Sequence, residues 1–212
     1  AQSVIPPGIA GNIKGYANPF KGPNVEAAKK MLAEAGYPEG KGLPEITYDI
    51  ADSTTSRQMA EFFQKQMDQI GIKIKIQASP WPEFLAKQKK RSLQMFGAAW
   101  GADYPDGENF LQLLYGPNAS PGANSSNYNN PDFNKEFEAA VVMPDSPERT
   151  ARYEKLNKFL AEETILMFNN HRQSYSISQG WLKNYHYSDL NNDYVQYLDV
   201  DNAKKAELLK KF

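Results

Sequence analysis

Residues 43–78 read "LPEITYDIADSTTSRQMAEFFQKQMDQIGIKIKIQA", and this stretch decides the fold. Apolar and polar residues alternate at both of its ends, which predicts two strands with inward side chains at Ile46, Tyr48, Ile50, Ile72, Ile74 and Ile76. A long helix is predicted between them, beginning near the hydroxyl cluster at 53–55 and ending at Gly71. Its apolar residues recur at helical spacing and should be buried, namely Met59, Phe62, Phe63, Met67 and Ile70. A strand, a helix and a strand in this order indicate a right-handed parallel pair and an α/β core.

Further elements are predicted on both sides of this unit. Asn24 is a predicted N-cap of a helix over residues 24–36, and a proline in the first turn marks another helix over residues 81–91. Residues 92–100, "SLQMFGAAW", predict a third strand. The remaining predicted elements are helices over 108–116, 131–142, 146–168 and 202–212, and a strand over 174–178. Residues 1–20 are rich in proline and glycine and predict an extended lead-in that packs on another part of the protein.

Composition removes several classes of function. The 24 basic and 25 acidic residues give a net charge of -1, so no broad electropositive surface for nucleic acid is expected. The absence of cysteine excludes thiol catalysis and disulfides. The two histidines, His171 and His186, lack the short helical spacing of a metal-binding pair, and no glycine-rich phosphate loop occurs. The sequence therefore predicts neither a metal nor a cofactor.

The stretch Met95–Gly116, "MFGAAWGADYPDGENFLQLLYG", is the candidate site. On the structural interpretation, Trp100 fills the core and Asp103 caps the turn that follows. On the functional interpretation, the turn lies outside the carboxyl end of a strand, where open α/β sheets bind ligands. There the tryptophan would provide an apolar wall, and the carboxylate would pair with a cation in a partly desolvated pocket. The residues alone favour neither interpretation.

Four strings in this order resemble a known family: "NVEAAKKMLAEAGYPEGKGLPEITYDIA", "AEFFQKQMDQIGIKIKIQ", "WGADYPDGENFLQLLYGPN" and "SNYNNPDFNKEFEAA". The chain resembles the C-terminal portion of the oligopeptide- and dipeptide-binding proteins of bacterial ABC transporters, extracellular solute-binding family 5. The resemblance implies a periplasmic-binding-protein-like type II lobe of α/β class, with a mixed sheet flanked by helices. It also implies a lead-in from a missing N-terminal lobe over 1–20, a ligand-binding lobe over 21–178 and a tail that returns toward the N-terminal lobe over 179–212.

In peptide-binding members of that family, the aspartate of the corresponding turn pairs with the terminal ammonium of the ligand. The resemblance places the turn at Trp100, Gly101, Ala102, Asp103 and Tyr104, and the preceding predicted strand, which contains Ala99, would offer backbone groups to a peptide. Some oligopeptide binders carry arginines just before this tryptophan to hold the ligand's carboxylate. Residues 93–99, "LQMFGAA", carry none, so the far end of the ligand stays unassigned.

The resemblance implies a non-enzymatic component of an ABC importer, without a cofactor, that captures a peptide or another small solute. Its partners would be the permease subunits and the missing lobe, and its location periplasmic or extracellular, with lipoprotein anchoring as one option. The family also includes binders of nickel chelates, haem, opines and oligosaccharides. Two other classes remain open: a glycoside hydrolase that uses two of the acids within residues 103–108, which requires facing carboxylates, and a structural module whose aromatic C-terminal loop packs on a partner.

Overall fold

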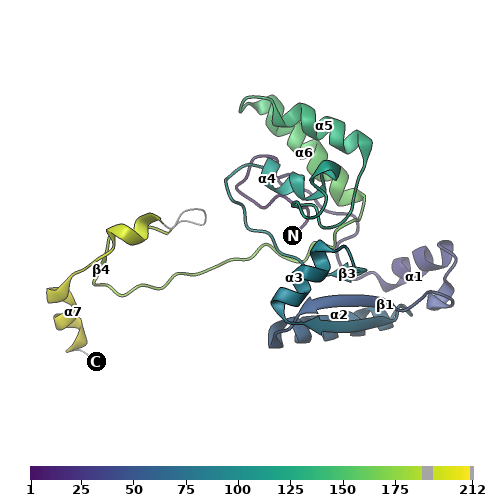
Figure 1. Cartoon of the computed structure of the whole chain (residues 1–212), viewed down its shortest axis with the longest axis horizontal. Helices are drawn as coiled ribbons and strands as arrows, with labels where there is room; N and C mark the ends of the chain where they lie inside the picture. The colour runs from purple at the N-terminus through teal and green to yellow at the C-terminus, as the bar shows by residue number, and fades with distance from the viewer. Residues whose placement is uncertain (188–192, 211–212) are drawn as a thin grey trace.

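The computed structural model describes residues 1–187 and 193–210. Figure 1 shows a sheet unit, a helical unit and a C-terminal tail; the chain passes from the lead-in at the helical unit into the sheet unit, returns to the helical unit after β3 and leaves it as the tail. The sheet unit holds the strand–helix–strand segment, and the helical unit lies above it around α5 and α6. Within the described ranges, no helix combines the length and the apolar character needed to span a membrane. The α/β class predicted from the sequence is confirmed.

The sheet unit is built on β1 (Ile46–Ala51) and β2 (Ile74–Ser79), which run parallel with Ile46 opposite Ile74. The helix α2 (Thr54–Asp68) connects them, as predicted, and Ser53 caps it by accepting the N–H of Ser56 at 3.1 Å. A two-residue strand, β3 (Met95–Phe96), pairs in parallel with the other edge of β1. The sheet order is β2-β1-β3. Both pairings are parallel, so this sheet is not the mixed sheet that was expected.

Two helices cover opposite faces of the sheet. Tyr48 of β1 meets Phe63 of α2 edge to face, with ring centroids 5.5 Å apart. On the other face, Phe96 of β3 meets Phe84 of α3 (Trp81–Lys89) at 6.3 Å. The helix α1 (Val25–Glu34) begins at Asn24, whose side chain accepts the N–H of Ala27, as predicted. A short 3-10 turn, η1 (Pro38–Gly40), follows it.

The buried face of α2 differs from the prediction. Met59 and Phe62 were expected to be buried but are 56% and 67% exposed, whereas Ala60 is 1% exposed. Helix and sheet approach closely at this alanine, and one turn later Gln64 Nε2 donates to the backbone oxygen of Ile74 at 2.6 Å. The stripe that faces the sheet therefore runs through a small and a polar residue, which a search for large apolar residues does not select.

Two predicted strands are also shorter than expected or not formed. Of residues 92–100, only Met95 and Phe96 form a ladder, and residues 97–101 are exposed. Residues 174–178 form no strand, and Ile177 is 98% exposed. Alternation in a sequence supplies the side-chain pattern of a strand, but a strand also needs a neighbour for its backbone hydrogen bonds. In the described residues, neither residues 97–100 nor residues 174–178 have such a neighbour.

The helical unit contains α4 (Glu108–Leu111), η2 (Gln112–Leu114), η3 (Gly116–Asn118), α5 (Pro131–Val141) and α6 (Pro147–Glu162). The last of these ends six residues before the predicted end at 168, because Thr164 leaves the helical conformation with φ +55°. One apolar cluster unites these helices, and its largest fully buried members are Tyr153, Phe133, Ile5, Leu111, Leu114 and Leu160.

The lead-in packs on this helical unit. Ile5 is 0% exposed and belongs to the same cluster as Tyr153. A Cβ on Gly11 would lie 2.6 Å from Tyr153 Cβ, and one on Gly107 would lie 2.4 Å from the backbone oxygen of Ala10. Both positions therefore require glycine, because the lead-in passes directly between the turn before α4 and the helix α6. The expectation that the lead-in packs on another part is met within this chain, while the predicted boundaries at 20 and 178 stay predictions.

The tail leaves the helical unit as an extended segment and stands apart from both units in Figure 1. It contains a two-stranded antiparallel ribbon of β4 (Leu182–Lys183) and β5 (Asp199–Val200), a 3-10 segment η4 (Asp193–Tyr197) and the helix α7 (Asn202–Leu209). The predicted terminal helix is thus confirmed up to residue 209. Residues 188–192 of the predicted aromatic loop and residues 211–212 of the predicted helix lie outside the described residues.

Candidate functional site

The five predicted site residues lie between β3 and α4, in residues 97–105, which are called the exposed run below. Ala99, Gly101 and Asp103 are exposed, and Trp100 and Tyr104 are 41% and 43% exposed. The structural interpretation required Trp100 to fill the core, and this exposure shows that it does not. The run connects the sheet unit to the helical unit, where the chain passes from the carboxyl end of β3 to the amino end of α4.

Asn109, which sequence reasoning did not single out, fixes this run through hydrogen bonds of its side chain. Its side chain is fully buried, and its Oδ1 accepts the indole N–H of Trp100 at 2.8 Å and the backbone N–H of Asp103 at 3.2 Å. Its Nδ2 lies 3.5 Å from Asp103 Oδ2. One buried amide thus connects two of the five predicted ligand-binding residues.

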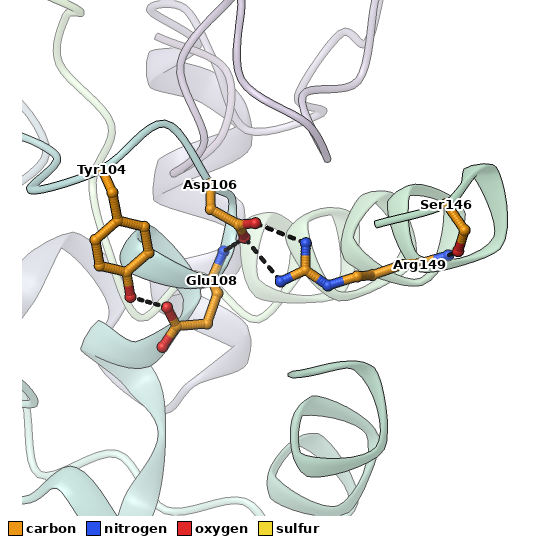
Figure 2. A network of polar contacts seen from close by, with 5 residues as sticks. All are labelled: Tyr104, Asp106, Glu108, Ser146 and Arg149. Atoms are coloured by element: carbon orange, nitrogen blue, oxygen red, sulfur yellow. Dashed lines mark hydrogen bonds and ion pairs between the residues drawn. The ribbon is translucent and has the colours of Figure 1, made fainter. Parts of the chain in front are cut away.

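A second anchor is the ion pair between Asp106 and Arg149, which sequence reasoning also missed. Arg149 of α6 donates to both carboxylate oxygens, at 2.6 and 3.2 Å, as Figure 2 shows. The guanidinium also lies over the ring of Tyr153, 4.6 Å from its centroid. The two side chains are only 27% and 12% exposed, so this pair is shielded from water far better than the other ion pairs of the described residues. It fixes the turn to the helical unit.

Asp106 is also the residue that caps the turn. Its Oδ1 accepts the backbone N–H of Glu108 at 2.9 Å, at the amino end of α4 (Figure 2). The structural interpretation assigned this task to Asp103. In the described structure, the only hydrogen-bonding partner of the Asp103 carboxylate is the distant Asn109 Nδ2. The exposed carboxylate of Asp103 therefore keeps most of its capacity to accept hydrogen bonds.

The third acid, Glu108, is engaged with the run itself. Its carboxylate accepts a hydrogen bond from the hydroxyl of Tyr104 (Figure 2). Partial burial, followed by this hydrogen bond, raises the pKa of the Tyr104 phenol above its ordinary value. Since Asp106 is paired with Arg149 and Glu108 with Tyr104, the structure gives no support to a facing pair of catalytic carboxylates here.

Other features of the described residues do not compete with this site. No group of three histidine, aspartate or glutamate side chains in residues 1–187 and 193–210 is placed to hold a metal ion. One open surface hollow of about 460 Å³ is lined by residues of α6 and the segment before it, including Asp145 and Glu154. Another of about 320 Å³ lies beside the lead-in and is lined by Tyr16, Lys21 and His171. Neither hollow includes a residue of the exposed run.

The chain is similar in sequence and in structure to known bacterial binding proteins. The glutathione-binding protein of Salmonella choleraesuis is 28% identical over 173 residues, which are 77% of this chain and 32% of that protein. The periplasmic oligopeptide-binding protein of Escherichia coli is 26% identical over 179 residues, 82% of this chain and 32% of that protein. A periplasmic binding protein associated with an ABC transporter of Helicobacter pylori, solved in complex with the peptide STSA, is 30% identical and matches with a TM-score of 0.66.

That structural match covers 77% of this chain and 31% of the Helicobacter pylori protein. The chain thus spans about a third of the length of the relatives it matches. Residues 1–122, more than half of the chain, match the profile described as "Bacterial extracellular solute-binding proteins, family 5 Middle". The strand–helix–strand unit and the turn that carries Trp100 and Asp103 both lie within this match. The chain belongs to the family of bacterial extracellular solute-binding proteins, family 5.

Proposed function

We propose that this chain is the ligand-binding lobe of the substrate-binding component of an ABC importer, and that its ligands are peptides. The family and the names of its relatives, which include oligopeptide- and glutathione-binding proteins, support this proposal. Its partners are then a peptide, the permease subunits of the importer and a further lobe that completes the binding cleft. Binding proceeds by closure of the two lobes about the ligand. The protein acts by binding and not as an enzyme, in the periplasm or outside the cell, with a lipid anchor as one mode of attachment.

Within this function, Asp103 is the anchor for the N-terminal ammonium of the peptide. One observation carries the assignment: Asp106, and not Asp103, caps the turn, so the exposed Asp103 carboxylate has no structural task of its own. Trp100 lies beside it as an apolar wall, and Ala99 and Gly101 contribute exposed backbone groups. An ammonium group has three donors, which a carboxylate and nearby backbone oxygens satisfy without reading any side chain of the peptide.

The test compares two deletions of the same contact in a full-length binding protein that contains this chain. Asp103→Asn keeps the shape of the side chain but removes its charge, and N-acetylation removes the charge of the ligand. Breaking a charge pair inside a closed cleft costs about 3–5 kcal/mol, or roughly two to four decades in Kd. Calorimetry with tri-alanine and N-acetyl-tri-alanine should therefore find each change costly and the two together little worse than one. Additive effects, or a wild type indifferent to acetylation, would end the assignment.

A further inference from the structure

Asn109 is a fully buried polar residue whose side-chain hydrogen bonds run to the exposed run above it. The acceptor is buried but the donors belong to exposed residues: Trp100 is 41% exposed, and Asp103 is exposed as well. A buried amide is costly unless its polar atoms are paired. Here that pairing is made with two groups that would otherwise be free to move in water, so the buried residue constrains the exposed ones.

The geometry at Asn109 Oδ1 fixes the two groups relative to each other. This single oxygen accepts the indole Nε1–H of Trp100 at 2.8 Å and the backbone N–H of Asp103 at 3.2 Å. The ring and the backbone of the aspartate are thereby held on a common acceptor, although three positions separate them in the chain. Nδ2 of the same amide, 3.5 Å from Asp103 Oδ2, lies on the side of the carboxylate.

The residue itself has little freedom to adjust. Asn109 lies within α4, its backbone N–H donates to Asp106 O at 3.2 Å, and Asp106 is held in turn by Arg149. Its neighbours Phe110 and Leu111 belong to the apolar cluster of the helical unit. Asn109 thus transmits the fixed position of that cluster to the exposed run.

We propose that Asn109 is a positioning residue for ligand binding: it sets the distance and orientation between the Trp100 ring and the Asp103 carboxylate, so that the ammonium of a ligand meets the carboxylate while the adjacent apolar portion lies on the ring. The proposal rests on the proposed function of Asp103. The ligand class it selects is a molecule with a primary ammonium group next to an apolar portion that can lie on the indole. Asn109 does not contact the ligand.

The first experiment tests the tether without any ligand. Solvent exchange of the Trp100 indole proton, measured by NMR, should be slow in the wild type and faster by at least about tenfold in Asn109→Ala, because the acceptor is lost. The double variant Asp103→Asn/Asn109→Asp exchanges the amide and the carboxylate, so it retains an acceptor oxygen for the indole and should restore slow exchange. If the wild-type indole proton exchanges as fast as in Asn109→Ala, or if the double variant fails to restore slow exchange, the proposal is overturned.

The second experiment measures the consequence for recognition in the full-length protein. The ratio of the Kd values of N-acetyl-tri-alanine and tri-alanine reports how well the ammonium is recognised. In Asn109→Ala this ratio should fall by at least about tenfold, because the ring and the carboxylate no longer share a fixed separation. If Asn109→Ala does not fold, Asn109→Ser, whose shorter side chain also withdraws the acceptor from the indole, replaces it in both measurements.

Asn157 provides a matched control. It is also asparagine, also 0% exposed and also in the helical unit, where it accepts from Ile5 N at 3.4 Å and donates to Gly11 O at 2.9 Å. Asn157→Ala should lower stability, as Asn109→Ala does, but should leave the ratio of Kd values unchanged. Equal effects of both substitutions on the ratio would reduce Asn109 to a stabilising residue and overturn the proposal. A wild type with a ratio near one would instead refute the role of Asp103, which separates the two failures.

Discussion

At the scale of single residues, two aspartates near the end of β1 have opposite electrostatic surroundings. Asp49 is 4% exposed and pairs across the sheet with Phe96, so it lies on the face covered by α3. Burial raises its pKa, and Lys87 opposes the shift only in part. Asp52 lies just beyond the strand, where its hydrogen bond with Arg57 at 2.7 Å lowers its pKa. The charged form is thus disfavoured at Asp49 and favoured at Asp52, although the two aspartates are only three positions apart.

These shifts predict opposite dependences of stability on pH. The folded state holds the Asp49 proton more tightly than the unfolded chain does, so its contribution falls as pH rises through the two pKa values. Asp49→Asn should therefore be more stable than the wild type at pH 7 and equal to it near pH 3. Asp52 contributes stability that is lost as pH falls, so Asp52→Asn should be less stable than the wild type at pH 7 and equal at low pH. Urea unfolding of the three proteins between pH 3 and 7 checks this, and differences of the same sign would contradict it.

At the scale of elements, the ion pair between Asp106 and Arg149 joins the turn before α4 to α6. Asp106→Asn keeps the oxygen that caps Glu108 N but leaves the largely buried guanidinium without a counter-charge. We expect a loss of about 2 kcal/mol in unfolding free energy, between the roughly 0–1 kcal/mol of an exposed pair and the 3–5 kcal/mol of a buried one. Denaturant unfolding measures it.

The control for this prediction is Glu34→Gln, which breaks the exposed pair with Lys30 on α1. That change should cost less than about 0.5 kcal/mol. Equal losses in the two variants would mean that the junction between the turn and α6 depends on packing alone and not on the charge of Asp106.

The elements also differ in how far the sequence determines them. The helix α1 and the pair β1 and β2 were predictable because their caps and alternation are local signals. The length of β3 was not, since it depends on whether a neighbouring strand is present. The packing face of α2 was misjudged because the close approach to the sheet uses Ala60, and large residues at Met59 and Phe62 were the stronger signal.

The site shows the same division. Trp100 and Asp103 stand out in the sequence because they follow a predicted strand and resemble a family motif. Asn109 does not, because an asparagine in a short helix has no distinctive pattern until its side chain is seen to reach back six residues. Arg149 pairs with Asp106 across 43 positions, and no local pattern announces a contact of that range.

At the scale of the whole molecule, the exposed run lies where the sheet unit and the helical unit meet, and nothing in the described residues covers it. The extended segment after α6 is exposed as well, including Tyr175 at 81% and Ile177 at 98%. Under the proposed function, these alternating apolar residues would pack on the further lobe. The part of this chain that matches the relatives covers about a third of their length.

The exposure of this run also limits the affinity of the isolated chain for a ligand. In this chain alone, an ammonium bound at Asp103 stays in contact with water, where an ion pair contributes only about 0–1 kcal/mol. Association costs several kcal/mol in lost freedom of the partners, roughly 4 or more, so this single contact cannot offset it. We therefore expect tri-alanine to bind the isolated chain with a Kd weaker than about 1 mM, and the full-length protein far more tightly. Micromolar binding to the isolated chain, measured by calorimetry or NMR titration, would show that this lobe recognises its ligand without closure and would contradict the two-lobe account.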